Sequence, residues 1–221
     1  PAWPAPEAIA RNGLETTMSI NERRFENRVA LVTGCGSRHG IGFATAALLM
    51  KSGAGIAITS TTDRIFKRQA TLEASGSRAV ARTADLTRMD QTRALVDYVI
   101  GQFGRIDILV NNAGAMWWDT VENTPIKRFD LVMDVNARAA FVAARAAVPH
   151  MRAAGGGHVL VYSPPLDLAM TPGKVAYCIS KFGMTMLAMG LGAELRDRNI
   201  GAAALWPATV IESQASINHG L

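Results

Sequence analysis

Tyr177 and Lys181, in the segment AYCISKFG, have the residue types and the spacing for proton transfer. Side chains four positions apart project from the same face of a helix. A phenol with an ordinary pKa of about 10 exchanges protons poorly at neutral pH, and a neighbouring ammonium group lowers this pKa. The pair therefore predicts an acid/base site, although the same spacing also occurs on solvated helix faces and the interpretation depends on the surrounding residues.

Two more polar residues could complete such a site. Ser163 lies fourteen positions before Tyr177, and a loop that brought its hydroxyl alongside would let it hydrogen-bond a substrate carbonyl or alcohol. Asn136 is a poor helix former within an otherwise apolar helical segment. An asparagine inside a helix is usually exposed, but one that faced the tyrosine and the lysine could hold a water molecule.

The elements that must position these residues alternate regularly. From residue 27 onward, short apolar segments that read as buried strands alternate with segments of helical periodicity. Strands are predicted at residues 28–34, 54–60, 78–86, 106–114, 158–163 and 200–206. We expect one α/β domain at residues 27–221, after an N-terminal extension at residues 1–26. Its doubly wound parallel sheet would carry helices on both faces and bind ligand at the carboxyl ends of the strands.

The sequence TGCGSRHGIG follows the first predicted strand and opens a helix. Glycine lets the backbone approach a phosphate closely, and a helix N-terminus offers free N–H groups and the positive end of the helix dipole. In this context the segment predicts nucleotide binding, the alternative being a merely flexible turn. The residues expected to contact the nucleotide here are Gly34, Ser37, Arg38, Gly40, Ile41 and Gly42.

The end of the second predicted strand bears on the choice of cofactor. It reads Ser60, Thr61, Thr62, with no carboxylate before Asp63. An acid at this point normally accepts hydrogen bonds from the ribose of NAD. Arg38, in the glycine loop, could meet a 2′-phosphate instead, unless it is simply exposed. These residues favour NADP(H), with NAD(H) still possible.

Later strand ends supply the remaining predicted cofactor contacts. Asp85 could accept a hydrogen bond from an adenine amino group, or it could cap the next segment. Asn112, within NNAG, could shape the floor of the cofactor site, although NNAG reads equally well as a turn. The complete additional set is Asp85, Leu86, Asn112, Ala113, Gly114, Tyr177, Lys181 and Pro207.

Apolar residues after the strand ends are expected to line a substrate site and indicate an apolar substrate. They are Met116, Trp117, Trp118, Pro164, Pro165, Leu166, Met170 and Trp206. The two adjacent tryptophans could equally belong to the core or to a lid. Pro164 should hold Ser163 extended, because a residue before proline avoids the helical region.

Composition limits the classes of function. With 221 residues, 49% of them hydrophobic and 19% charged, the chain reads as one globular domain. The net charge of +5 is dispersed without a basic run, so a phosphorylated small molecule is a more economical partner than nucleic acid. No apolar run reaches the roughly 18 residues that a membrane span needs. The N-terminus lacks a secretory pattern and the two cysteines suggest no disulfide, so a cytoplasmic protein is expected, and no metal site.

Taken in order, TG-x(5)-GIG, NNAG, the helical asparagine, the serine and Tyr-x-x-x-Lys resemble the short-chain dehydrogenase/reductase family over residues 28–210. The resemblance implies a Rossmann-type fold. It also implies that Tyr177 is the acid/base and that Lys181 lowers its pKa and binds the nicotinamide ribose. Ser163 would orient the substrate oxygen, and Asn136 would hold the water of a proton relay.

A narrower likeness concerns four segments, TPIKRFDLVMDVNARAAF, SPPLDL, AYCISKFGMTML and ALWPATVIES. These are similar to the hydroxysteroid-dehydrogenase-like and citronellol-dehydrogenase-like subgroup, which is associated with apolar carbonyls, acyl chains or terpenoids. The resemblance implies an NADP(H)-dependent oxidoreductase that interconverts an alcohol and a carbonyl on an apolar small molecule. A 3-oxoacyl carrier-protein reductase, with an acidic protein partner, and a catalytically silent NADP(H)-binding protein are the alternatives.

The chain also departs from the family pattern. Its glycine loop is longer than the common TG-x(3)-GIG form, and Pro207-Ala208 replaces the usual Pro-Gly. Because a substrate-covering helix and a seventh strand commonly lie beyond the position of Leu221, we expect a C-terminally incomplete domain without the last strand. The resemblance implies that the alanine-rich helix at residues 136–148 pairs across subunits, so a homodimer or homotetramer is expected, although packing within one chain would use the same residues.

Overall fold

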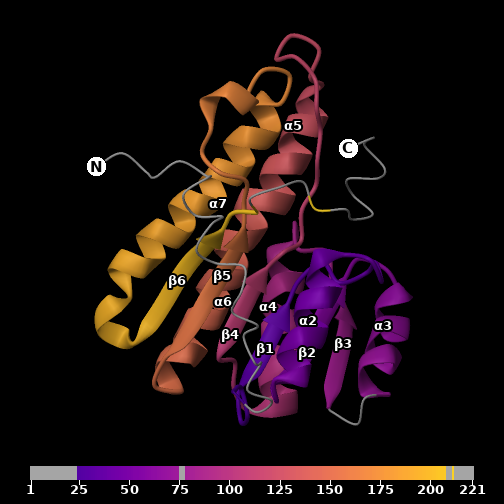
Figure 1. Ribbon diagram of the computed structural model, residues 1–221, viewed down its shortest axis with the longest axis vertical. Coiled ribbons are helices and arrows are strands. Elements are labelled where there is room, and N and C mark those ends of the chain that lie inside the picture. Colours follow the sequence, from indigo (N-terminus) through magenta and orange to yellow (C-terminus); the bar gives the residue numbers. More distant parts are fainter. Residues whose placement is uncertain (1–23, 75–77, 208–210, 212–221) are drawn as a thin grey trace, which may run out of the picture.

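Six parallel strands form one sheet in the computed structural model, which describes residues 24–74, 78–207 and 211. The strand order is β3-β2-β1-β4-β5-β6, running from right to left in Figure 1. The strands are β1 Val29–Val32, β2 Gly55–Ser60, β3 Ala79–Thr83, β4 Ile108–Asn111, β5 Gly157–Tyr162 and β6 Ile200–Leu205. After β3 the chain returns to the middle of the sheet, so that β4 pairs with β1. The predicted doubly wound fold is confirmed.

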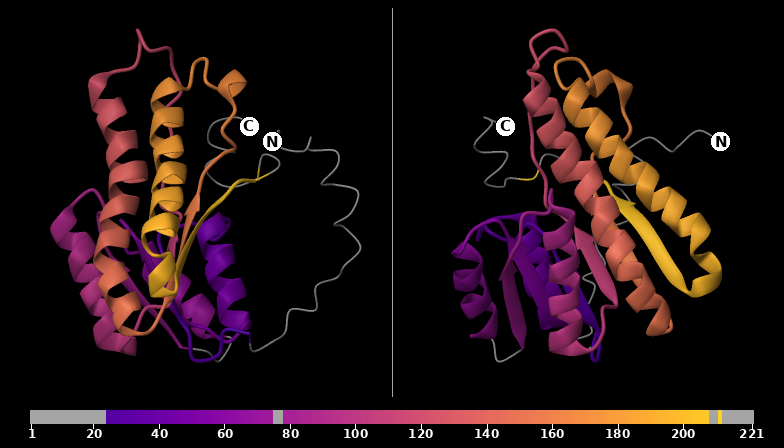
Figure 2. Two further views of the ribbon diagram at one scale, coloured as in Figure 1. Left: turned by 90° about the vertical axis from the view of Figure 1, so that its left-hand side faces the viewer. Right: turned by 180° about the vertical axis from the view of Figure 1, so that it is seen from behind.

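Helices cover the sheet on both faces. The α-helices are α2 Ile41–Lys51, α3 Arg64–Glu73, α4 Met89–Phe103, α5 Ile126–Val132, α6 Ala139–Ala153 and α7 Val175–Glu194. A π-helix, η1 Met133–Arg138, joins α5 to α6, and short 3₁₀ turns occur at η2 Leu168–Met170 and η3 Arg196–Arg198. Figure 2 shows that α5, η1 and α6 run as one long helical segment beside α7.

The core has two layers because successive strand residues face opposite sides of the sheet. Leu31 and Leu109 pack in the cluster that includes residues of α4 and α6. Ile58 and Val110 pack in the cluster that includes residues of α2 and α3. Strands buried on both faces explain the continuous apolar segments of the sequence.

Helix α7 belongs to this packing. Among the described residues it is the one helix whose length and mean hydropathy would by themselves permit a membrane crossing, and 39% of the relevant window is buried within the protein. The helix contacts β5, β6 and η1. Core helices of globular domains share these properties, so they carry little weight as a sign of a membrane span.

Asp107 ties the amino ends of the central strands together. Its carboxylate accepts hydrogen bonds from Arg105 (Nη2 to Oδ1, 2.6 Å), Arg28 (Nη1 to Oδ1, 2.9 Å) and the backbone N–H of Val29 (2.9 Å). Burial favours a raised pKa for this carboxyl, but the hydrogen bonds from the two arginines and Val29 outweigh burial, and the pKa is lowered. This edge of the sheet is therefore structural and lies opposite the edge where a ligand is expected.

The two predicted chain ends are described only in part. Of the expected N-terminal extension, the structure describes Phe25, which is partly buried and donates its backbone N–H to the Ser52 carbonyl (2.8 Å). Residues 1–23 of that extension, and the region expected to lack a seventh strand, lie outside the described residues.

Candidate active site

A cavity of about 930 Å³ opens at the carboxyl ends of the strands. Its size lies at the upper end of the range for small-molecule sites, roughly 300–1,000 Å³. Most predicted cofactor residues line it: Gly34, Ser37, Gly40, Ile41, Ser60, Thr61, Thr62, Asp85, Leu86, Asn112, Ala113, Gly114, Tyr177, Lys181 and Pro207. Ser163 also lines it, as do Met116, Trp118, Pro164, Pro165 and Met170. Five predicted cofactor or substrate residues do not, namely Arg38, Gly42, Trp117, Leu166 and Trp206.

Two glycines of the loop between β1 and α2 are required by close packing. Gly34 has a φ of +72°, and a Cβ added there would lie 2.7 Å from the Ala113 Cα. A Cβ at Gly42 would collide with the side-chain amide of Asn112. Gly42 was expected to contact the nucleotide, but the structure instead uses its lack of a side chain to bring α2 against the end of β4.

Thr33 joins the glycine loop to the end of β4, a role that sequence reasoning missed. Its hydroxyl accepts hydrogen bonds from the backbone N–H groups of Asn112 (3.0 Å) and Ala113 (2.9 Å). The Asn112 amide in turn donates to the carbonyls of Thr33 (2.8 Å) and Gly34 (3.2 Å). Asn112 therefore lines the cavity and holds the glycine loop against the end of β4. A polar residue at the end of an apolar strand was the available signal for Thr33.

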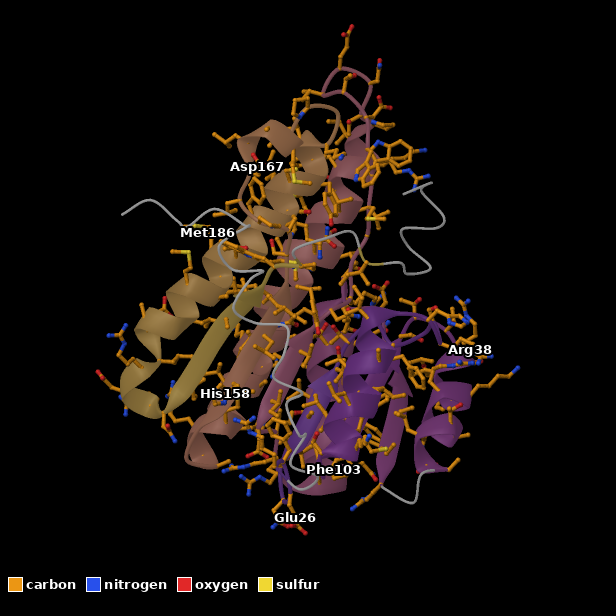
Figure 3. The ribbon with its side chains drawn as sticks, viewed as in Figure 1. Glu26, Arg38, Phe103, His158, Asp167 and Met186 are labelled. Carbon is orange, nitrogen blue, oxygen red and sulfur yellow. The ribbon has the colours of Figure 1, made fainter. Side chains whose placement is uncertain are left out.

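Of the arginines Arg38 and Arg64, only Arg64 lines the cavity. Arg38 is exposed and lies outside the cavity lining, in agreement with the alternative considered for it; Figure 3 labels it on the outer surface. Arg64, the first residue of α3, lines the cavity and donates through Nε to the Thr62 hydroxyl (3.3 Å). Sequence reasoning missed Arg64 because it considered cations only within the glycine loop.

Asp85 lines the cavity and also caps the turn that follows it. Its Oδ1 accepts hydrogen bonds from the Thr87 backbone N–H (3.0 Å) and the Thr87 hydroxyl (2.7 Å). Asp85 can therefore both cap this turn and contact an adenine amino group, because its second carboxylate oxygen makes no such bond to Thr87.

Asn136 is fully buried within the π-helix η1. Its Oδ1 accepts from the Ala115 N–H (2.8 Å), and its Nδ2 donates to the Ala115 carbonyl (2.9 Å) and to the Ser180 hydroxyl (2.8 Å). The Ser180 hydroxyl donates to the Tyr177 carbonyl (2.7 Å). Both amide hydrogens of Asn136 are therefore used within the protein. The side chain fixes the loop after β4 to the helix that carries Tyr177, and Ser180 is a link that sequence reasoning missed.

Lys181 reaches into the site through a buried ammonium group. Its Nζ donates to the Tyr162 carbonyl at the end of β5 (2.9 Å), and burial lowers its pKa to about 8. Burial, with a smaller effect from Cys178, raises the pKa of Tyr177 to about 12. The expected lowering of the Tyr177 pKa is therefore absent in this structure, because burial dominates.

Ser163 is buried, and its hydroxyl is engaged by the helix rather than presented alone to the cavity. Its Oγ donates to the Lys181 carbonyl at 2.9 Å and lies 3.2 Å from the Pro164 carbonyl oxygen. In this conformation the hydroxyl proton is not directed at a substrate. The observed bond ties the end of β5 to α7 beside Tyr177 and Lys181.

The three predicted tryptophans occupy different places. Trp118 lines the cavity, and the Lys174 ammonium lies 4.7 Å from its ring centroid. Trp117 lies outside the lining, with the Arg128 guanidinium 4.7 Å from its ring centroid. Trp206 is 37% exposed and donates its indole N–H to the Thr185 hydroxyl (3.2 Å). Of the three tryptophans predicted to contact the substrate, Trp118 thus lines the cavity, and the other two do not.

Comparison with known proteins agrees with this geometry. A family model for short chain dehydrogenases matches residues 28–218. Hydroxysteroid dehydrogenase-like protein 2 from Homo sapiens is 37% identical over 208 residues, which cover 90% of this chain and 49% of the relative. The orthologue from Pongo abelii is 38% identical over the same length. The chain spans about half the length of these curated relatives.

Solved structures show the same architecture. A metagenomic short-chain oxidoreductase in complex with NADP superimposes with a TM-score of 0.80 and 29% identity, covering 89% of each chain. An NAD⁺-bound xylitol dehydrogenase superimposes with a TM-score of 0.79 and 29% identity, covering 84% of this chain and 71% of the other.

Proposed function

The chain belongs to the short-chain dehydrogenase family, and from this premise we propose that it is an NADP(H)-dependent oxidoreductase that interconverts an alcohol and a carbonyl on an apolar small molecule. The observation that carries the proposal is that one cavity joins the glycine loop to Tyr177 and Lys181. A nucleotide on the loop and a substrate beside the phenol would therefore meet within the same space.

The residues present fit a nicotinamide dinucleotide. Gly34 leaves open the space that a side chain would fill beside Ala113, and the N-terminus of α2 lies directly after the loop. The loop would hold the pyrophosphate, Asp85 the adenine end, and Lys181 the nicotinamide ribose. When bound in reduced form, the nicotinamide supplies a hydride to the carbonyl carbon.

The preference for NADP(H) is supported by the end of β2. Ser60, Thr61 and Thr62 line the cavity there, and none of them carries a charge that would repel a 2′-phosphate. Arg64 lies beside them and offers a guanidinium, which suits phosphate recognition. One of the solved neighbours binds NAD⁺ and another NADP, so the preference rests on these residues alone.

Tyr177 would act as the general acid in the direction of reduction. With a pKa of about 12 the phenol is protonated throughout the neutral range, so it can give its proton to the carbonyl oxygen as the carbon receives the hydride. The product is the alcohol, and a phenolate is left on Tyr177, on the helix that also carries the Lys181 ammonium. Reprotonation from solvent returns the site to its starting state.

The apolar substrate is supported by the lining near Tyr177. Met116, Trp118, Pro164, Pro165 and Met170 present carbon and sulfur surfaces to the cavity. A hydrophobic body of the substrate would displace water from these surfaces on binding.

We further propose that the protein is a homo-oligomer. On the outer surface of α7, Met186 and Met189 are each 63% exposed, and Phe141 of α6 is 55% exposed; Figure 3 shows Met186 projecting outward. Exposed apolar side chains on long neighbouring helices suit a helix-to-helix interface with a second copy. Light scattering after gel filtration would give the mass, and a monomer at micromolar concentration contradicts the proposal.

The function is tested by oxidation of NADPH in the presence of a panel of apolar ketones, aldehydes and acyl thioesters, with Tyr177→Phe as the matched variant. Removal of a general acid should lower kcat by about 10²–10⁴-fold while NADPH binding stays nearly unchanged. Equal turnover by both proteins would refute the role of Tyr177. Tight NADPH binding without turnover would favour a silent binding protein, and turnover confined to carrier-protein thioesters would favour a 3-oxoacyl reductase.

A further inference from the structure

Among the described residues, four charged side chains line the cavity, those of Arg64, Asp85, Lys174 and Lys181. Three of them make the hydrogen bonds within the protein described above. The ammonium of Lys174 has no hydrogen-bond acceptor and no ion-pair partner in residues 24–74, 78–207 and 211. It is therefore the one cation of the lining that donates no hydrogen bond within those residues.

The surroundings of Lys174 hold this charge in place. The side chain is partly buried, and its Nζ lies 4.7 Å from the centroid of the Trp118 ring, whose face attracts cations. The charge also acts on Cys178: burial raises the pKa of this buried thiol, and Lys174 opposes the increase. An ammonium held against apolar walls has lost part of its hydration, so an anion that entered the cavity would be attracted to it.

The position of Lys174 relative to Tyr177 indicates where an anion bound by Lys174 would lie. Lys174 immediately precedes α7, three residues before Tyr177, and one turn of helix rises about 5.4 Å. The backbone of Lys174 thus lies about one turn from that of Tyr177, and both residues line the same cavity. An anionic group bound by Lys174 would therefore share this cavity with the substrate carbon that reacts at Tyr177.

We propose that Lys174 binds a carboxylate of the substrate, so that the substrate class is an apolar hydroxy or oxo acid. The assignment of a reacting hydroxy or oxo group rests on the proposed oxidoreductase function, whereas the binding of a carboxylate by Lys174 does not. A carboxylate on the substrate itself suits one shared cavity better than the phosphate of a thioester carrier, because that phosphate lies many bonds from the acyl carbonyl.

The adjacent tryptophan provides a matched control. Arg128 stacks on Trp117 at the same centroid distance, 4.7 Å, but neither residue lines the cavity. Arg128→Met removes a cation from a tryptophan face outside the site, while Lys174→Met does so within it. Lys174→Arg keeps the charge and the contact with the ring.

The test is calorimetric binding of octanoate and of octanamide, its uncharged counterpart, to the full chain and these three variants. We expect the wild-type chain to bind octanoate about tenfold or more tightly than octanamide. Lys174→Met should abolish this preference, and Lys174→Arg and Arg128→Met should retain it.

The proposal is overturned if wild type shows no preference for octanoate, if it binds neither ligand, or if Lys174→Met keeps the preference. Binding is measured without turnover, so failure of the oxidoreductase assay leaves this result readable on its own. Where the enzyme does turn over carbonyls, the ratio of kcat/KM for an oxo acid to that for its amide should fall about tenfold in Lys174→Met.

Discussion

Replacement of Asn136 by alanine is expected to destabilise the fold by an amount that can be worked from its hydrogen bonds. The side chain is 0% exposed and makes three hydrogen bonds, two with the backbone of Ala115 and one with Ser180. In Asn136→Ala, the Ser180 hydroxyl keeps its bond to the Tyr177 carbonyl. The N–H and the C=O of Ala115 lose their partners, and each unsatisfied buried group costs about 1–3 kcal/mol.

Since Ala115 is only partly buried, we expect the lower part of this range, about 3 kcal/mol for the two groups together. With a urea m-value of about 2 kcal/mol/M, the unfolding midpoint would fall by roughly 1.5 M. Urea unfolding followed by circular dichroism measures this shift. Asn123→Ala, at an exposed position in the loop before α5, is the control and should change the free energy of unfolding by less than about 0.5 kcal/mol.

Asn136→Asp separates hydrogen bonding from side-chain volume. The carboxylate can still accept from the Ala115 N–H, but it faces the Ala115 carbonyl with no hydrogen to donate. We expect a loss of stability at least as large as that of Asn136→Ala at neutral pH. A loss below about 1 kcal/mol in both variants would refute the reasoning that these bonds fix the loop to α7.

Three other predictions concern the cofactor end and the opposite edge of the sheet. Arg64→Ala should weaken NADPH binding about tenfold or more and leave NADH binding nearly unchanged. Thr61→Asp should shift the preference toward NADH. Equal NADPH/NADH affinity ratios in wild type and in both variants would contradict the role of the end of β2 in cofactor preference. Gly42→Ala should lower both thermal stability and NADPH affinity, because its methyl group must displace the Asn112 amide; an unchanged Tm in differential scanning calorimetry would contradict this. The lowered pKa of Asp107 stabilises the fold above the unfolded-state pKa of about 3.9, and this contribution is lost as pH falls through the folded-state pKa. Acid titration of the free energy of unfolding should therefore be less steep in Asp107→Asn, and identical slopes would show that the two arginines do not act on this carboxyl.

The fold could be predicted because its signals are local. Each strand is buried on both faces, so apolar segments such as that of β1 stand out against the helical periodicity between them. The topology then brings the strand ends to one edge, which is why Gly34, Asp85 and Asn112 were found from order alone.

The residues that sequence reasoning missed depend on contacts between distant segments. Arg64 enters the cavity only because α3 begins beside the glycine loop, and nothing in the local sequence distinguishes it from Arg38. The pKa of Tyr177 depends on its burial, and the place of the Lys181 ammonium depends on its bond to the Tyr162 carbonyl. Helical spacing predicts that the two side chains share a face, but it contains no information on either of these quantities.

The Thr33 hydroxyl connects segments that are far apart in the sequence. Its partners Val110, Asn112 and Ala113 lie 77 to 80 positions away. We expect such contacts to form late in folding, because the chain must close a long loop before they contribute free energy. The floor of the cofactor site should therefore be among the first parts lost when the protein unfolds, and a nucleotide bound there should slow unfolding more than it speeds folding.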